Sequence, residues 1–246
     1  NCGAKSTHTV TFKTVNTSPG WKVIASTVSG PYFYEGVSAN EPVVSGQPSK
    51  LLILAPTETR NPGSASGKAG SATGQQVDST FTVTVLLTDN DWNIVTATNA
   101  NVFVQTQDSF DTDPTTFTVS NGSGTADIAF HTAGNWTLRV TTTNSNALTA
   151  YTHAPISVAT GTPVKLQILV PGETALPGSE FGKTSVAITT QQADSGFNVT
   201  VNVTDKYWNR RADANGNTKI LFSSDDPINK LAILPGELIV TNGQIV

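Results

Sequence analysis

The chain has 246 residues, which is enough for two domains of ordinary size that each bury a hydrophobic core. Charged residues make up 13% of it, the formal net charge is −4 and no basic patch stands out, which argues against nucleic acid as a partner. No run of about 18 apolar residues occurs, so we predict no transmembrane span.

Methionine and cysteine are scarce. Methionine is absent, even at position 1, and no signal-peptide pattern opens the chain, which indicates a mature chain whose leader was removed or a segment of a longer one. Cys2 is the single cysteine, so no disulfide can form within the chain. Its role stays open between a free thiol, a disulfide to another chain and a lipid anchor, against which the preceding Asn1 argues.

The first 49 residues match the end of a repeat. PGWKVIA at 19–25 matches GNWTLRV at 134–140, and alternation places Trp21, Val23 and Ala25 on one face of a predicted strand. We therefore expect residues 1–49 to be the C-terminal part of a repeat.

An aromatic cluster follows in GPYFYEG, at positions 30–36. Tyr32 and Tyr34 could stack on sugars if they lay in an exposed loop. Aromatic residues also pair with β-branched neighbours across strands, and we favour this interpretation.

Residues 50–164 are predicted to form one complete repeat. KLLILAPTETRNPGSASGK at 50–68 matches KLQILVPGETALPGSEFGK at 165–183, and FTVTVLLTDNDWN at 81–93 matches FNVTVNVTDKYWN at 197–209. Short alternating strands with Gly, Asn and Pro between them predict an antiparallel β-sandwich. The residues expected in its core are Phe81, Val83, Val85, Trp136 and Leu138.

A long polar stretch follows the first predicted strand of each copy. Its composition alone would predict a flexible linker, but four positions recur with the same spacing. They are Glu58, Pro62, Gly67 and Lys68, matched by Glu173, Pro177, Gly182 and Lys183. We therefore expect an ordered loop that packs on its own sandwich or on the next domain. The spacing from Gly63 to Lys68 does not fit a phosphate loop.

An Asp-x-x-x-Asn motif ends the next predicted strand, at Asp89 to Asn93 and again at Asp205 to Asn209. Asp and Asn side chains bond nearby backbone N–H groups, so we expect a strand-end turn. Trp92 and Trp208 are expected to cap the end of each sandwich. Calcium is the weaker alternative, with Asp89, Asp91 and Asn93 as oxygen ligands, because Tyr207 replaces the middle carboxylate in the second copy.

A strand of the FTVTV type followed by Asp-x-x-x-Asn resembles the bacterial Ig-like tandem repeats of large extracellular and cell-surface proteins, of the adhesin or invasin type. The commoner form of that family has Gly before the Asn, where this chain has Trp92 and Trp208. The resemblance implies an all-β fold of tandem immunoglobulin-like antiparallel β-sandwiches. It also implies an extracellular or cell-surface location and a role as spacer or binding module.

Residues 165–246 are expected to be the N-terminal part of a further repeat. TNGQIV at 241–246 matches only the start of SNGSGTADIAF at 120–130. Residues 1–49 resemble the missing part, so either the chain is a window from a longer array, or this segment of one copy completes the repeat of its neighbour by strand complementation. The residues expected at such an interface are Val10, Phe12, Trp21, Val23, Leu238 and Val240.

No catalytic or metal-binding constellation stands out. His8, His131 and His153 lack metal-ligand spacing, and no GxSxG elbow supports a nucleophilic serine. We therefore expect neither enzyme activity nor a cofactor. Alternation is expected to turn two sequon residues, Asn198 and Asn202, toward solvent. The candidate glycosylation sites are Asn16, Asn121, Asn135, Asn198 and Asn202.

These features favour a structural subunit or segment of an extracellular filament or surface fibre. Its expected partners are copies of itself, joined head to tail. The alternative is an adhesin or carbohydrate-binding surface module, with host or matrix glycans as partners.

Overall fold

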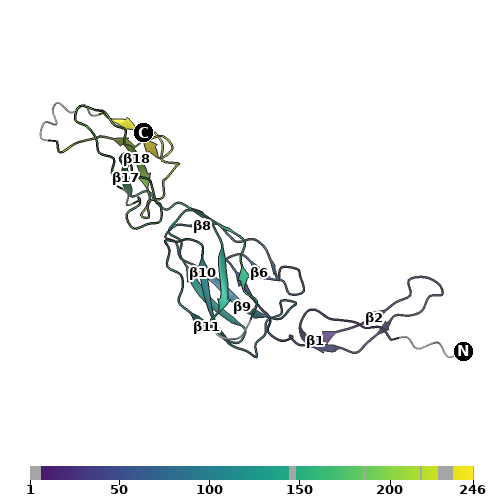
Figure 1. Ribbon diagram of the computed structural model, residues 1–246. Coiled ribbons are helices and arrows are strands. Elements are labelled where there is room, and N and C mark those ends of the chain that lie inside the picture. The colour runs from purple at the N-terminus through teal and green to yellow at the C-terminus, as the bar shows by residue number, and fades with distance from the viewer. Residues whose placement is uncertain (1–6, 144–147, 185–186, 217, 227–234, 246) are drawn as a thin grey trace.

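The computed structural model describes residues 7–143, 148–184, 187–216, 218–226 and 235–245. All regular elements among them are β-strands, which confirms the all-β prediction. Three parts follow one another in a row, with the two termini at opposite ends (Figure 1). We name them the N-terminal segment (residues 7–49), the middle body (50–164) and the C-terminal body (165–245). The described residues include no helix long and apolar enough to cross a membrane.

The N-terminal segment consists of two antiparallel ladders preceded by an arm. β1 (Asn16–Trp21) pairs with β4 (Glu41–Val43), and β2 (Ile24–Ala25) pairs with β3 (Gly36–Val37). The arm, residues 7–12, has no strand assignment. Most side chains of this segment are exposed, because two-stranded ladders without a facing sheet enclose no core.

The middle body is a β-sandwich. Its first sheet has the order β12-β9-β5, formed by Ser123–Ile128, Phe81–Thr88 and Lys50–Leu54. The second has the order β11-β10-β14-β15, formed by Phe117–Val119, Ala100–Thr106, Leu138–Thr142 and Tyr151–Thr152. The smaller sheet β13-β16-β8 is formed by Gly134–Trp136, Ile156–Ala159 and Gln75–Gln76, and the β6-β7 ladder by Thr59–Arg60 and Lys68–Ala69.

The core of the middle body lies between the first two sheets. Phe81, Val83 and Val85 alternate inward along β9, as predicted, and pack with Leu138 of β14 in one buried cluster. Trp136 differs from its prediction, because it is only partly buried and lies against the edge of the cluster. Its indole N–H donates to the backbone oxygen of Thr132 at 2.6 Å, which holds the ring near the surface.

The C-terminal body is smaller. β17 (Lys165–Leu169), β18 (Thr200–Thr204) and β21 (Gln244–Ile245) form one sheet, and β19 (Lys219–Ile220) pairs with β20 (Leu238–Ile239). Its buried core, as far as the structure describes it, is Val201, Val203, Ile220, Val240 and Ile245.

The ladders of the two outer parts use the same registers as ladders of the middle body. In the N-terminal segment, adding one constant to the numbers of both paired residues gives a residue pair of the middle body. The matched pairs are Trp21–Glu41 with Trp136–Ile156, and Ile24–Val37 with Arg139–Thr152. The C-terminal body likewise matches Leu166–Val203 with Leu51–Leu87, and Val201–Ile245 with Val85–Gly124. The N-terminal segment thus resembles the last ladders of the middle body, and the C-terminal body its first.

Candidate functional site

The Asp-x-x-x-Asn motif forms the predicted turn. Asp89 accepts the backbone N–H groups of Asp91 and Asn93 on one carboxylate oxygen, each at 2.9 Å. Trp92 adopts a φ of 67°, a left-handed conformation that reverses the chain. Both Asp89 and Asn93 are buried, although the turn lies at the end of a strand, so something else must cover it.

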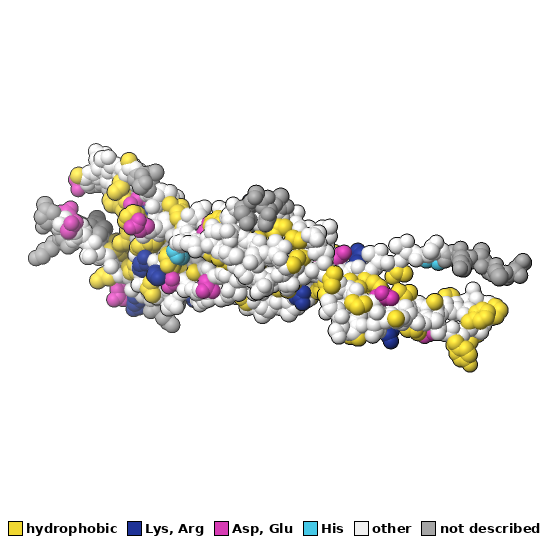
Figure 2. Space-filling view, turned by 90° about the horizontal axis from the view of Figure 1, so that it is seen from below, with side chains coloured by type: hydrophobic (Ala, Val, Ile, Leu, Met, Phe, Trp, Pro, Cys, Tyr) yellow, Lys and Arg dark blue, Asp and Glu magenta, His cyan; other side chains and the backbone are white. Residues whose placement is uncertain are grey.

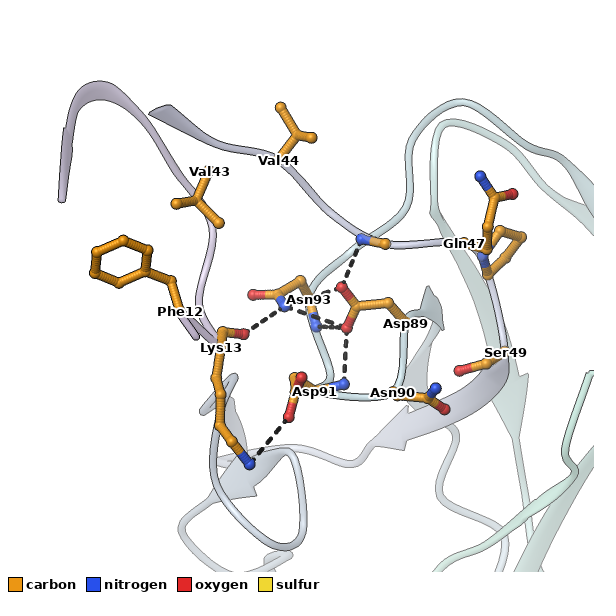
Figure 3. Close-up of a pocket in the computed structure, with 12 residues that line it drawn as sticks. Phe12, Lys13, Val43, Val44, Gln47, Ser49, Asp89, Asn90, Asp91 and Asn93 are labelled. Carbon is orange, nitrogen blue, oxygen red and sulfur yellow. Dashed lines mark hydrogen bonds and ion pairs between the residues drawn. The ribbon is translucent and has the colours of Figure 1, made fainter. Parts of the chain in front are cut away.

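At the first junction, where the N-terminal segment meets the middle body, the N-terminal segment covers this turn. The backbone N–H of Gly46 donates to the second Asp89 oxygen at 2.9 Å. The Asn93 amide accepts the N–H of Val15 at 2.9 Å and donates to the carbonyl of Lys13 at 2.8 Å. Figure 3 shows Lys13, Asp89 and Asn93 converging beside a cleft of about 400 Å³.

The second junction repeats this arrangement between the middle and C-terminal bodies. The N–H of Gly161 donates to Asp205 at 2.8 Å. The Asn209 amide accepts the N–H of Ala133 and donates to the carbonyl of His131, both at 2.8 Å. The Asp-x-x-x-Asn motif therefore fixes each body to the part of the chain that precedes it. We call each set of these hydrogen bonds a latch.

Each latch fixes the relative orientation of two parts of the chain. Each asparagine amide accepts from one backbone N–H and donates to one backbone carbonyl two residues earlier, so it fixes position and orientation as well as distance. The Asn93 and Asn209 side chains are buried, so losing these partners would leave their amides unsatisfied. The sequence analysis missed this role, since the motif gives the turn but not its partners.

The calcium alternative conflicts with the donors around Asp89. Burial alone would raise the pKa of this carboxyl, but N–H groups from Gly46, Asn93 and Asp91 outweigh it and hold the pKa below its ordinary value. A cation would have to displace these donors. Asp91 instead faces Lys13 at 3.6 Å. No group of three or more His, Cys, Asp or Glu able to hold a metal occurs among the described residues.

The middle residue of each Asp-x-x-x-Asn motif makes a different contact across its junction. Tyr207 stacks on His131 with ring centroids 3.8 Å apart, where the first junction pairs Asp91 with Lys13. Asp78 of the middle body accepts bonds from Lys206 at 3.0 Å and from the Tyr207 hydroxyl at 3.1 Å. The replacement of Asp91 by tyrosine thus exchanges an ion pair for a ring stack across the junction.

The polar stretch after β5 is an ordered loop that packs on its own sandwich. The ring of Trp92 lies directly over Gly67, where a Cβ atom would overlap the indole, and Lys50 covers the ring with its ammonium 3.7 Å from the centroid. The C-terminal body places Trp208 over Gly182 in the same way. The recurrent glycine is therefore explained by the tryptophan that it accommodates.

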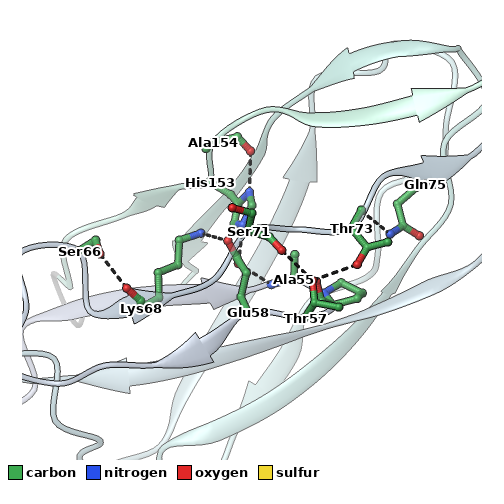
Figure 4. Close-up of polar contacts among 11 residues, drawn as sticks. Ala55, Thr57, Glu58, Ser66, Lys68, Ser71, Thr73, Gln75, His153 and Ala154 are labelled. Carbon is green, nitrogen blue, oxygen red and sulfur yellow. Dashed lines mark hydrogen bonds and ion pairs between the residues drawn. The ribbon is translucent and has the colours of Figure 1, made fainter.

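A buried polar cluster ties the same loop to the second sheet (Figure 4). Glu58 accepts a bond from Lys68 at 2.6 Å and contacts Nε2 of His153 at 2.7 Å. Nδ1 of His153 lies 2.6 Å from the carbonyl oxygen of Ala154. Burial raises the pKa of Glu58, but Lys68, the N–H of Ala55 and His153 together hold it below its ordinary value.

The C-terminal body leaves an apolar sheet face open. Leu166, Ile168 and Phe197 are 47%, 52% and 51% exposed. Their counterparts in the middle body, Leu51, Ile53 and Phe81, are 0%, 0% and 7% exposed, because β14 and its neighbours cover them. We call Leu166, Ile168 and Phe197 the open face.

The residues predicted for an interface are not brought together within the chain. Val10, Trp21 and Val23 are exposed on the N-terminal segment, and Phe12 lines the cleft at the first junction. At the other end, Leu238 is partly buried. Val240 is buried inside the C-terminal body, so it cannot contribute contact surface as predicted.

The candidate glycosylation sites differ in exposure. Asn121, Asn135 and Asn198 are exposed, and Asn16 is partly buried. The expectation that Asn202 faces solvent is wrong, because it is buried and its amide donates to Gln167 at 2.7 Å on the neighbouring strand. The strand period places Asn202 on the side away from its own core, but Gln167 on that side is also buried and donates to the carbonyl of Gly182 in the loop after β17.

Two further expectations concern the N-terminal segment. Tyr32 and Tyr34 lie in the loop between β2 and β3, so the favoured strand interpretation is wrong. Their rings meet edge to face with centroids 6.5 Å apart, and both are exposed. Cys2 lies outside the described residues.

One sequence match was missed and becomes visible through the junctions. HTVTFKT at 8–14 corresponds to ADIAFHT at 126–132, because Lys13 and His131 occupy equivalent positions in the two latches. Thr14 and Thr132 likewise accept the indole N–H of Trp21 and Trp136. A comparison that allowed a length change before the tryptophan could have found it.

Comparison with known proteins adds no relative: no protein-family model matches the chain, and no curated protein matches it.

Proposed function

We propose that this chain is a structural segment of an extracellular filament, in which β-sandwich bodies join head to tail and neighbouring chains complete one another with strands. The observation that supports it most is the open face of the C-terminal body. Exposed apolar surface next to incompletely paired strands favours association.

The N-terminal segment carries side chains suited to cover this face. By the shared ladder registers, Val23 corresponds to Leu138, which is fully buried against the equivalent face of the middle body. Ala25 corresponds in the same way to Val140. The segment lies at the far end of the molecule from the open face (Figure 1), so we expect it to act on another copy.

Such a contact repeats in one direction. The N-terminal segment and the open face are different surfaces, so each added copy presents a fresh face, and the assembly grows as an open filament unless it closes into a ring. The two latches favour stiffness along the filament, because each fixes one part on the next through hydrogen bonds of a buried asparagine amide.

Sedimentation of the full chain over a range of concentrations, with electron microscopy of the products, tests this proposal. We expect concentration-dependent oligomers that lengthen into filaments. Ile168→Asp should abolish them, because a charge would replace an apolar side chain that becomes buried on assembly. Since Ile168 is half exposed in the single chain, the variant should keep its circular dichroism spectrum.

Leu221→Asp is the matched control. Leu221 is also exposed on the C-terminal body, but its neighbour Ile220, not Leu221, belongs to the buried core. This variant should assemble normally. A wild-type chain that stays monomeric at high concentration, or equal assembly of Ile168→Asp, would contradict the proposal.

A surface-binding role is the second candidate, supported by the exposed Tyr32, Phe33 and Tyr34 in the β2-β3 loop. Exposed aromatic rings can stack on sugars. Glycan-array binding that is lost in Tyr32→Ala, with assembly unchanged, would favour it over the filament role. If the chain bound no glycan, the exposed aromatic loop would no longer support a surface-binding role.

A further inference from the structure

Within the part of the chain that the structure describes, residues 197–199 of the C-terminal body have no strand partner, whereas their counterparts in the middle body do. In the middle body β9 begins at Phe81, and its first three residues pair with Ala126, Asp127 and Ile128 of β12. In the C-terminal body β18 begins only at Thr200. The strand is therefore shorter at its start, where the second half of a β12-like partner would lie.

The first half of that partner is present. β21 pairs Gln244 with Asn202 and Ile245 with Val201, in the register that β12 uses with β9. Continuing this antiparallel register past Ile245 leads along residues 199, 198 and 197. The position next to these residues is thus defined by an existing ladder.

The arm of the N-terminal segment has the sequence that belongs at this position. Val10 corresponds to Ile128 and Phe12 to Phe130, two side chains fully buried in the middle body. Val10 itself is 55% exposed. Thr9 and Thr11 flank Val10 in the sequence, so in a strand they would lie on the face opposite to Val10 and Phe12.

The arm of the same chain is at the wrong end. Figure 1 shows the N-terminal segment and the C-terminal body at opposite ends of the row, and Figure 2 shows the N-terminal segment as the narrower end of the molecule. In the single chain residues 7–11 of the arm are exposed, so they are accessible to the open face of a second copy. The arm of a second copy is therefore the occupant to which the geometry points.

We propose that residues 8–12 of a second copy add as an antiparallel strand beside residues 197–199, with Thr9 opposite Asn198 and Val10 opposite Phe197. This inference rests on the filament function proposed above and specifies its joint. The equivalent of β12 would then consist of β21 from one chain and residues 8–12 from the other.

The joint would reproduce the buried contacts of the middle body. There Phe81 and Phe130 pack with ring centroids 5.8 Å apart, which predicts the same contact between Phe197 and Phe12 of the second copy. A slip of one residue would turn Val10 outward, so burial selects the register. On the outward face, Thr9 of the second copy and Asn198 would take the positions that Asp127 and Thr82 have in the middle body, where the two side chains are hydrogen-bonded at 2.6 Å.

Disulfide trapping between chains tests the register. In a Cys2→Ser background, chains with Thr9→Cys are mixed with chains with Asn198→Cys and oxidised gently. Both positions are exposed, so neither substitution should disturb the fold. We expect a disulfide-linked dimer that forms at least roughly tenfold faster than with Thr11→Cys, which lies two residues out of register and beyond disulfide reach.

The outcomes separate the joint from the filament. Filaments that form while Thr11→Cys links as fast as Thr9→Cys, or while neither links, would overturn this register and leave the filament proposal intact. A chain that stays monomeric at high concentration and forms no link would overturn both. A double variant that links only within one chain would overturn the second copy as occupant.

Discussion

Glu58 has surroundings unlike those of an ordinary surface carboxylate. It is buried between Lys68 and His153, and each of its oxygens accepts at least one bond. Removing its charge would leave two basic groups without their shared partner, and unpaired buried charges are costly. The cluster therefore links the loop after β5 to β15 and the segment that follows it.

Glu58→Gln should lower the free energy of unfolding of the middle body by about 2 kcal/mol at neutral pH. The folded-state pKa lies below the unfolded value near 4.5. The interaction therefore stabilises fully above that value and is lost as the pH falls through the folded pKa, so the two proteins should converge in acid. Urea unfolding followed by circular dichroism at several pH values measures this.

Asp127→Asn provides the comparison within the same body, because Asp127 is an exposed carboxylate that accepts a bond from Thr82. It should change stability by less than about 0.5 kcal/mol. An effect of Glu58→Gln as small as this, or one independent of pH, would show that the cluster does not stabilise the fold through its charge.

At the scale of elements, the polar loop after β5 is held in place by a contact between one glycine and one tryptophan that lie far apart in the sequence. Gly67 has a φ of 74°, and Trp92 lies against it from the turn after β9. The polar composition of the loop is typical of a linker, but the tryptophan, the Glu58 cluster and a bond from the Gly63 N–H to the Asp91 carbonyl at 2.7 Å hold it in place.

Gly67→Ala should destabilise the middle body by about 2 kcal/mol or more, because the added Cβ overlaps Trp92 and the backbone is left-handed there. Denaturant unfolding measures the loss. Gly74→Ala is the control in the same loop, since its Cβ would meet only the Ser157 carbonyl at 3.5 Å, an ordinary contact. If both variants were equally stable, the loop would not depend on the tryptophan contact.

At the scale of the whole molecule, the latches decide whether the three parts move together. Asn209 links the C-terminal body to backbone groups at His131 and Ala133. In the middle body, Asp108 holds the same stretch by accepting the N–H groups of His131 and Thr132 at 2.9 and 2.7 Å. The middle-body side of the contact is therefore held by hydrogen bonds of its own.

Asn209→Ala should let the C-terminal body reorient relative to the middle body. Small-angle scattering should show a broader distribution of overall dimensions, and NMR relaxation should show faster independent tumbling of the smaller body. Lys206→Ala should change neither, because Lys206 makes only exposed contacts, an ion pair with Asp78 and a contact with the Tyr207 ring. Unchanged scattering and relaxation in Asn209→Ala would mean that the latch does not set the orientation.

The sequence by itself determined the strand content and the inward faces of the strands. Phe81, Val83 and Val85 lie in the core as predicted, because the two-residue period of a strand is a local property that the sequence displays directly. The recurrence of Gly67 and Lys68 also indicated order in the polar loop, since a flexible linker has no need of fixed positions.

Only the tertiary structure decided which groups meet. The partners of Asp89 and Asn93 are backbone atoms at Gly46, Val15 and Lys13, which carry no side-chain signature that a sequence could show. Asn202 was misplaced for a related reason, because alternation gives the face of a strand but not whether another group covers that face. Local periodicity is encoded residue by residue, whereas contacts depend on how separate segments pack, and the packing is fixed by the whole chain.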